Sequence, residues 1–158
     1  SSDLPHTPVL VGGWGESFVK QDKLHALVGE RLRPQCQSAG QQALTMAGMS
    51  IDDIQHFEGY DASTFHLINH IEGHGFAKPG EGLERYKAGE MSLTGKLPVN
   101  TAGGMLSGSY MHGWNHIAEI TRQLRHEAGE NQIKDVEISM FSIAQTDQVH
   151  PLIFKRGD

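Results

Sequence analysis

The sequence predicts an α/β fold in which a five-stranded mixed sheet carries helices on both faces, in the order βαβαβαββ. Three observations lead to this prediction. Short apolar runs of strand length alternate with longer segments whose apolar residues recur at helical spacing. Turns rich in glycine separate many of these segments. The last two apolar runs, at 136–143 and 149–154, are joined by a polar turn, which predicts a hairpin and therefore one antiparallel strand in a largely parallel sheet.

The first third of the chain predicts one strand and two helical stretches. The apolar run TPVLV at 7–11 is expected to form a buried strand that Gly12 and Gly13 end. A helix is expected from about Asp22, where leucines and a valine are spaced for one face. Pro34 is expected to open a second helical stretch, because proline is favoured at the start of a helix.

The middle third continues the alternation. A short capped turn, SIDDI, leads into a brief strand near 55–58. The segment 62–72 has helical apolar spacing, and Gly73 and Gly75 are expected at the end of that helix. The charged, glycine-rich stretch that follows is expected to be a loop with a short helix at 83–87. The run LPVN at 97–100 then predicts a strand.

The last third predicts a glycine-rich turn at 101–109, a strong helix at 112–127 and the closing hairpin. The sequence contains no internal repeat and no linker. Its 158 residues suffice for one core and are too few for two. We therefore expect residues 1–158 to form a single domain.

Composition narrows the function class. Hydrophobic residues make up 37% of the chain and charged residues 20%, which argues against disorder. The net charge is −6 and the 13 lysines and arginines form no block, so nucleic acid is not an expected partner. No apolar stretch approaches the roughly 18–20 residues that span a bilayer, and no signal peptide is expected. One cysteine, Cys36, allows no internal disulfide and favours a reducing, cytoplasmic setting; we expect it to be a small core residue.

Three segments resemble the C-terminal half of the thiolase superfamily. The segment NTAGGMLSGSYMHGWNHIAEITRQLRHEAGENQ at 100–132 is similar to the thiolase segment in which an Asn and a Gly-Gly turn lead to a catalytic His at a helix start. The segment at 47–65 resembles the one that bears the thiolase Asn-Glu motif, and GFAKPGEG at 75–82 resembles the following loop of sterol-carrier-protein-x type thiolases. The resemblance covers nearly all of the chain from Leu4. It implies the C-terminal half of the thiolase fold, which needs an N-terminal half to complete a coenzyme A site.

The sequence also departs from the thiolase pattern. Tyr110 occupies the position of the family's catalytic His, and Tyr60, followed by Asp61, occupies that of the Asn. The late cysteine of thiolases would fall near Ala144, where none is present. The Tyr-Asp pair and the segment 107–116 resemble lipid-transfer-protein-like aldolases that shorten steroid side chains. That resemblance implies retro-aldol cleavage of a β-hydroxyacyl-CoA, no cofactor beyond the coenzyme A thioester of the substrate, and a partner built from an OB-fold and a zinc ribbon.

Two tyrosines can serve a retro-aldol step. One group must take the proton from the β-hydroxyl, and another must stabilise the developing enolate. We expect Tyr60 and Tyr110 to be this acid–base pair, with Asp61, His112 and His116 in support. A tyrosine with a pKa of about 10 costs roughly 4 kcal/mol as a base near pH 7. The positive end of a helix dipole stabilises a nearby phenolate by roughly 0.3–1 kcal/mol. A neighbouring cation or hydrogen-bond chain therefore has to supply the remaining stabilisation. Which tyrosine is the base stays open.

The glycine-rich turn is expected to contact the substrate. Its backbone amides would lie near the thioester. Four residues are predicted to bind substrate: Asn100, Gly103, Gly104 and Ser107.

Histidines raise the question of a metal. His66, His70 and His74 recur four residues apart on one predicted helix, a spacing that can hold a metal ion. His112 and His116 are also four apart, but their HGWNH segment lacks the Glu of a zinc peptidase helix. The first three have no carboxylate on their face, and His74 falls beyond the predicted helix end. We therefore expect solvent-facing imidazoles and no metal site.

Two other functions stay open. One is a non-catalytic scaffold or binding subunit of thiolase-like fold, in which Tyr60 and Tyr110 need not share a pocket. The other is half of an acetyl-CoA acyltransferase (thiolase) whose catalytic cysteine lies on another chain, which the tyrosine at the His position opposes. Because Ser1 coincides with the boundary between thiolase halves, we expect one subunit of a split enzyme or an excised domain. Such a half should expose an apolar surface and join a homo- or hetero-oligomer.

Overall fold

The computed structural model describes residues 3–18, 32–145 and 148–157. In chain order its elements are β1 (Val9–Trp14), β2 (Ser17–Phe18), α1 (Leu32–Ala47), the short 3₁₀ helix η3 (Ile51–Asp53), β3 (His56–Gly59), α2 (Thr64–His74), α3 (Gly82–Lys87), α4 (Gly104–Ser107), α5 (Trp114–Leu124), η4 (Gly129–Asn131), β4 (Ile138–Gln145) and β5 (Gln148–Arg156). The helix expected from about Asp22 falls on residues outside the described ranges. The stretch expected from Pro34 is α1, which holds this proline in its first turn, where a missing amide is tolerated.

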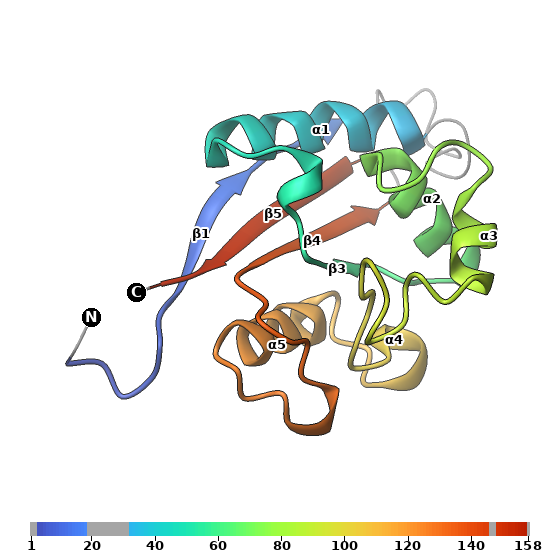
Figure 1. Cartoon of the computed structure of the whole chain (residues 1–158). Helices are drawn as coiled ribbons and strands as arrows, with labels where there is room; N and C mark the ends of the chain where they lie inside the picture. Colours follow the sequence, from blue (N-terminus) through green and yellow to red (C-terminus); the bar gives the residue numbers. More distant parts are fainter. Residues whose placement is uncertain (1–2, 19–31, 146–147, 158) are drawn as a thin grey trace.

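The described strands form one mixed sheet in the order β1-β5-β4-β3, and β2 pairs with β5. β3 and β4 are parallel, whereas β5 is antiparallel to β1, β2 and β4. The closing hairpin therefore supplies the strand that opposes the others in direction, as predicted. Because β5 lies inside the sheet and not at its edge, most neighbouring pairs are antiparallel (Figure 1).

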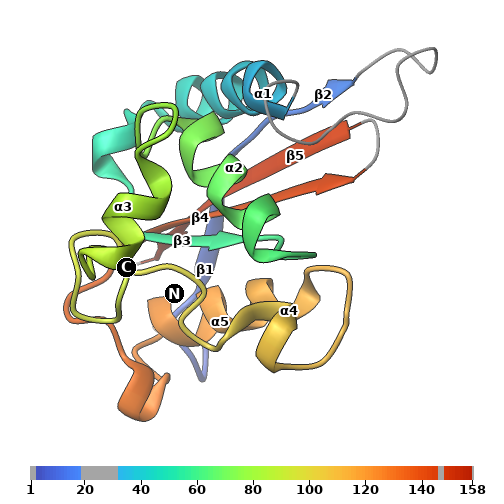
Figure 2. The ribbon, with the colours of Figure 1, turned by 90° about the vertical axis from the view of Figure 1, so that its right-hand side faces the viewer.

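Helices cover both faces of the sheet, which confirms the predicted architecture. Figure 1 shows α1 and α2 on one side and α5 on the other, and the perpendicular view in Figure 2 shows the same layers. The side chains of β4 explain how both faces are covered, because neighbouring residues in a strand point to opposite faces of the sheet. Met140 packs in a core cluster with Ile71 of α2, whereas Phe141 packs with Ile120 and Leu124 of α5.

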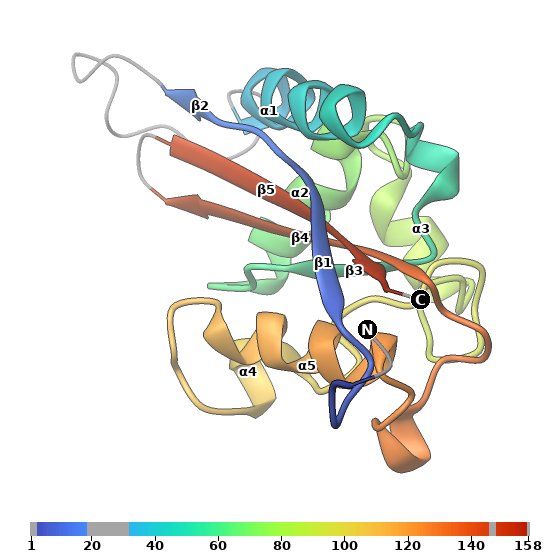
Figure 3. The same cartoon turned by 90° about the vertical axis from the view of Figure 1, so that its left-hand side faces the viewer.

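β1 lies at the edge of the strand order (Figure 3) and is not the buried strand that was expected, because Leu10 is 44% and Val11 58% exposed. The strand continues through the two glycines that were expected to end it. A Cβ atom on Gly13 would lie 2.2 Å from the carbonyl oxygen of Ala43 in α1, whereas one on Gly12 would meet nothing nearer than 3.8 Å. The register of β1 with β5 also shifts between Val11 and Gly13. Glycine therefore lets the strand pass close to α1 instead of terminating it.

Two boundaries in the middle of the chain also differ from the prediction. α2 runs through Gly73 to His74; of the two glycines expected at its end, Gly75, with φ of 91°, forms the left-handed cap. Gly73 belongs inside the helix because its missing side chain admits Cys36, whose Cβ would lie 2.8 Å from an added Cβ. The strand expected at 97–100 is reduced to one isolated parallel bridge from Val99 to Phe57. β2 takes its place in the count of described strands.

The turn expected at 101–109 contains the short helix α4, and the helix expected at 112–127 is shorter than predicted. α5 begins at Trp114 because His112 and Gly113 both have positive φ, 48° and 95°, which an α-helix cannot continue. Within the described ranges, no helix has both the length and the apolar character needed to cross a bilayer.

Candidate active site

The two tyrosines that depart from the thiolase pattern meet in the structure. Tyr60 directly follows β3, and Tyr110 lies in the loop between α4 and α5. Their hydroxyl oxygens are 3.3 Å apart, within hydrogen-bond reach. Tyr60 is 5% exposed and Tyr110 is 63% exposed. One phenol is therefore held inside the fold, while the other lies at the surface.

A chain of buried carboxylates and imidazoles begins at Asp61 and leads inward. The Nδ1 atom of His116 lies 2.6 Å from Oε2 of Glu58, and its Nε2 atom lies 3.2 Å from Oδ1 of Asp61 without making a hydrogen bond. The other carboxylate oxygen of Glu58 is 3.0 Å from Nε2 of His56. All four side chains are almost completely buried. The chain joins β3 to α5 and ends beside Asp61.

Glu58 is the centre of this chain. Burial alone would raise its pKa, but the hydrogen bonds and charges of His116 and His56 outweigh burial and hold the pKa below the ordinary value of 4.5. The backbone amide of Thr101 also donates to Glu58 over 2.9 Å. Glu58 is therefore a carboxylate at neutral pH, and it ties the turn after the Val99 bridge to β3.

Asp61 organises the glycine-rich turn. Its Oδ1 atom accepts a hydrogen bond from the amide of Met105 at 2.9 Å, and its Oδ2 atom accepts one from Leu106 at 3.4 Å. A Cβ atom on Gly104 would lie only 2.2 Å from Oδ2 of Asp61. Gly104 also has a φ of 60°, a backbone region that favours glycine. Gly104 therefore lets this carboxylate reach the first amides of α4.

The other predicted substrate-binding residues, Asn100, Gly103 and Ser107, all line one cavity, and Asn100 is also bonded to the backbone. The side-chain amide of Asn100 is engaged by the backbone of Gly59, which donates to it over 2.8 Å and accepts from it over 3.0 Å. Gly103 and Ser107 line a cavity of about 290 Å³. Asn100 and Asp61 also line this cavity, and most of its other lining side chains are apolar. The cavity can therefore hold an apolar group beside the candidate site.

The surface around Tyr110 is apolar, as expected for a half-unit. Leu106, Met111 and Trp114, on or next to α4 and α5, are each more than half exposed, like Tyr110 itself. The ring of His112 packs edge-on against Tyr110, with 4.6 Å between ring centroids. His112 thus lies in the exposed layer of the site, whereas the other supporting histidine is buried.

Sequence reasoning missed several polar residues of the site. His56 and Glu58 share one side of β3, because alternate residues in a strand point the same way. Glu119 and Gln123 share a face of α5 with His116, and the hydroxyl of Thr101 donates to Glu119 over 2.7 Å. The sequence did contain a sign of their burial, because the polar residues of α5 alternate with Ile and Leu on one face of the helix. Amphipathic spacing alone would have assigned them to solvent.

The solvent-facing prediction for the histidines of α2 is wrong. His70 is fully buried and His74 is 8% exposed, because α2 lies two residues later in the chain than expected and packs this face toward α1. The fold also brings Cys36 of α1 to these two rings. Among the described residues, this is a group that could hold a metal ion, and it includes neither tyrosine.

Comparison with known proteins identifies the family. The model described as Thiolase C-terminal domain-like matches residues 23–145, which is most of the chain. The chain belongs to this family. The predicted resemblance to the thiolase superfamily and the predicted fold class are thereby confirmed.

Among its relatives, this thiolase C-terminal domain-like chain is similar to two steroid-acting enzymes. A steroid side-chain-cleaving aldolase of Thermomonospora curvata is 33% identical over 126 residues, which cover 78% of this chain and 32% of that protein. A 17-hydroxy-3-oxo-4-pregnene-20-carboxyl-CoA lyase of Mycobacterium tuberculosis is 37% identical over 92 residues, which cover 58% of this chain and 24% of that protein. The chain thus spans about a third or less of the length of these relatives.

A solved structure agrees with the sequence relatives. The Ltp2-ChsH2(DUF35) aldolase matches 98% of this chain with a TM-score of 0.87 and 30% sequence identity. The match covers 41% of the aldolase chain. The thiolase C-terminal domain-like fold described above is therefore shared, over nearly the whole chain, with part of an aldolase.

Proposed function

We propose that this chain is the C-terminal part of an acyl-CoA aldolase, a carbon–carbon lyase that cleaves a β-hydroxyacyl-CoA by a retro-aldol step. The observation that carries the proposal is the 3.3 Å separation between the hydroxyl oxygens of Tyr60 and Tyr110. A scaffold has no need to bring these two phenols together. The aldolase and lyase names of the relatives support the same reaction class, and their steroid substrates make a steroid acyl-CoA the substrate to try first.

We assign the base to Tyr110, because it is the exposed member of the pair. Tyr110 takes the proton of the substrate β-hydroxyl as the bond between the α- and β-carbons breaks. A ketone or aldehyde leaves, and the bond electrons pass to the thioester as an enolate. Protonation of that enolate at the α-carbon restores the proton balance.

Tyr60 stabilises the phenolate of Tyr110 by donating a hydrogen bond to it. Hydrogen bonds to charged groups contribute about 1.5–3 kcal/mol, against the roughly 4 kcal/mol needed to ionise a phenol near neutral pH. The buried chain from Asp61 through His116 to Glu58 fixes the position of the β3 end from which Tyr60 projects. Tyr60 is therefore a hydrogen-bond donor whose position is set by buried side chains near the end of β3.

The acyl chain has an apolar site beside these groups. The cavity of about 290 Å³ is lined by Leu67, Ile68 and Leu106 together with the predicted substrate-binding residues Gly103 and Ser107. We assign it to part of the acyl group. The thioester and the coenzyme A moiety then extend toward the N-terminal half of the enzyme.

The exposed apolar residues around Tyr110 are the surface that we assign to partners. We propose that an N-terminal thiolase half, on the same or a separate chain, covers it and completes the coenzyme A site. A second partner with an OB-fold and a zinc ribbon fits the implied aldolase subfamily. The structural relative's name, Ltp2-ChsH2(DUF35) aldolase, likewise joins two components. Burial of these side chains favours the assembly at about 25 cal/mol per Å² of apolar surface.

Retro-aldol turnover of a β-hydroxyacyl-CoA tests the proposal. The assay uses this chain assembled with its N-terminal half and the OB-fold partner. Tyr110→Phe and Tyr60→Phe should each lower turnover at least a hundredfold while assembly and circular dichroism stay unchanged. The third tyrosine, Tyr86, also lines the cavity but is the matched control, since Tyr86→Phe should cost less than tenfold. Absence of cleavage, or parental turnover in both variants, would favour the scaffold function.

A further inference from the structure

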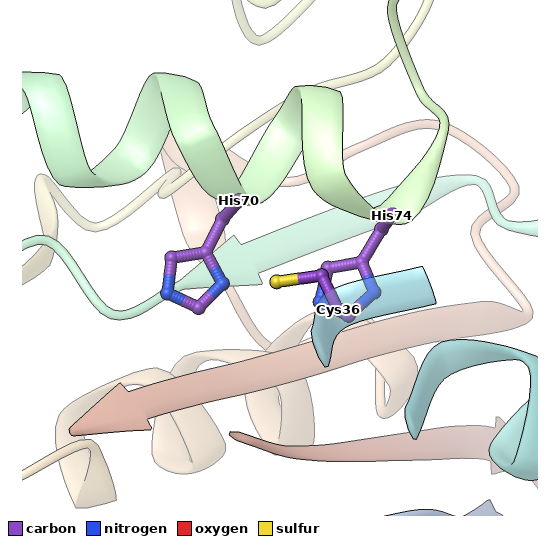
Figure 4. Close-up of side chains that lie close together, drawn as sticks. All are labelled: Cys36, His70 and His74. Atoms are coloured by element: carbon purple, nitrogen blue, oxygen red, sulfur yellow. The ribbon is translucent and has the colours of Figure 1, made fainter. Parts of the chain in front are cut away.

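The buried side of α2 holds a group of soft metal ligands that the aldolase reaction does not use. The sulfur of Cys36 and one ring nitrogen each of His70 and His74 lie within 4.8 Å of one another. Figure 4 shows the sulfur of Cys36, which comes from α1, directed between the two rings. Cys36 and His70 are fully buried, and His74 is 8% exposed.

Both ring nitrogens of His70 are buried without a hydrogen-bond partner. The ring of His74 also interacts with the backbone of Cys36, although its Nδ1 atom makes no hydrogen bond of good geometry. Buried polar groups are nearly always paired, and leaving one unpaired costs about 1–3 kcal/mol. The remaining nitrogen of His74, Nε2, bonds the hydroxyl of Ser142 over 2.8 Å. Metal-bound histidines have this arrangement, in which one nitrogen is oriented by a protein group and the other faces the ion.

Two glycines keep the space around the group clear. A Cβ atom on Gly40 of α1 would lie 2.8 Å from Nδ1 of His74, and one on Gly73 of α2 would lie 2.8 Å from the Cβ of Cys36. A surface hollow lined by Gly40, His74 and Gly75 reaches one of the three side chains, His74. An ion can therefore approach the group from this side.

The protonation states agree with ligation. Burial lowers the pKa of His74 to about 3 and that of His70 well below its ordinary value, so both rings are neutral, the form that binds metals. Burial raises the pKa of the Cys36 thiol to about 12. A bound cation deprotonates a coordinating thiol, so binding would release one proton from Cys36 to solvent.

We propose that Cys36, His70 and His74 bind one zinc ion, with a water as the fourth ligand. Thiolate and imidazole ligands favour zinc over calcium or magnesium, which prefer oxygen. Bonds of about 2.0–2.3 Å to a tetrahedral ion place ligand atoms roughly 3.3–3.6 Å apart, so side chains whose ligand atoms now lie within 4.8 Å converge by at most about 1.5 Å on binding. The ion cross-links α1 to α2. This inference goes beyond the proposed function, because the site does not contain the tyrosine pair.

Metal titration of the chain assembled with its N-terminal half tests the proposal. The zinc-ribbon partner is left out, because its own zinc would obscure the count. After treatment with a chelator, the protein is titrated with Zn²⁺ and, separately, with Co²⁺ as a spectroscopic probe. We expect one ion per chain, a thiolate-to-cobalt charge-transfer band and a higher melting temperature with Zn²⁺. His6→Gln, which removes an exposed histidine, is the control and should behave like the parent.

Variants of the site separate it from adventitious binding. Cys36→Ser should abolish the charge-transfer band, and His70→Gln should weaken Zn²⁺ binding at least tenfold. Gly40→Ala keeps all three ligands but fills the space beside His74, and should weaken binding by a similar factor. No saturable binding, or a parental titration in Cys36→Ser, would overturn the proposal. If the ligand variants do not fold, the cobalt spectrum of the parent decides alone, since a spectrum without a thiolate band excludes Cys36. None of these readouts depends on turnover, so they remain decisive if the aldolase proposal fails.

Discussion

The hydroxyl oxygens of Tyr60 and Tyr110 lie 3.3 Å apart, although 50 residues separate them in the sequence. One follows a buried strand and the other lies in an exposed loop. A proton or a hydrogen bond shared between them makes their contributions to a reaction interdependent.

We therefore expect the two phenols to act as a unit. The double variant Tyr60→Phe/Tyr110→Phe should lose little more turnover than Tyr110→Phe alone, because the donor has no function without the phenolate that it stabilises. The measurement is kcat for a β-hydroxyacyl-CoA in all four combinations. Losses that multiply fully in the double variant would show that the tyrosines act independently.

Gly104 is expected to support the site through Asp61. Gly104→Ala places a methyl group 2.2 Å from the carboxylate and strains a backbone at φ of 60°, so it should lower turnover at least tenfold and stability by about 1–3 kcal/mol. The matched control is Gly48→Ala, which has a φ of 67° but nothing within 4 Å. It should lose stability by about 1–2 kcal/mol from backbone strain and keep its turnover. Equal turnover in the two variants would contradict the role given to Asp61.

Glu58 is expected to make stability depend on pH. Its folded-state pKa lies below the ordinary value of 4.5, so its stabilising effect is present at neutral pH and is lost as the pH falls through the folded-state value. Glu58→Gln should lower the free energy of unfolding at pH 7 by about 1.5–3 kcal/mol and flatten its decline below pH 4.5. Urea unfolding from pH 7 to pH 3 measures both effects. The exposed Glu84→Gln is the control, and an equally steep acid decline in Glu58→Gln would refute the prediction.

The two glycines of β1 are expected to differ sharply. Gly13→Ala drives a methyl group into the backbone of α1, with 2.2 Å to the carbonyl oxygen of Ala43, and should cost at least about 1–3 kcal/mol. Gly12→Ala meets nothing nearer than 3.8 Å and should be neutral or slightly stabilising, because alanine restricts the unfolded chain. Thermal unfolding of both variants checks the contrast. A similar melting temperature for the two would mean that β1 does not approach α1 this closely.

Much of the fold was predictable because patterns within a few residues of sequence determine where strands, helices and turns form. The capped turn at Ser50 and the alternation through the closing hairpin reflect burial and turn chemistry within a few residues. The apolar run of β1 did form a strand, but Leu10 and Val11 are exposed and not buried as expected. The prediction failed where distant segments set the outcome. Gly13 and Gly73 were interpreted as ends of elements, but each admits a neighbouring element that the local sequence does not reveal.

The candidate site shows the same division. Tyr60, Asp61 and Tyr110 were found because they stand at positions with a family pattern, and the structure brings them together. The buried partners Glu58 and His56 were missed, because charged residues on a strand are ordinarily assigned to solvent.

The sequence by itself determined the alternation of strands and helices, the family and the identity of the two tyrosines. The tertiary structure alone decided that β5 lies inside the sheet, that the two phenols touch, and that Cys36 meets His70 and His74. The physical reason is that spacing along the chain fixes which face of an element a side chain occupies. Which faces then meet depends on packing between elements, where a missing methyl group or a buried ion pair determines how closely they approach.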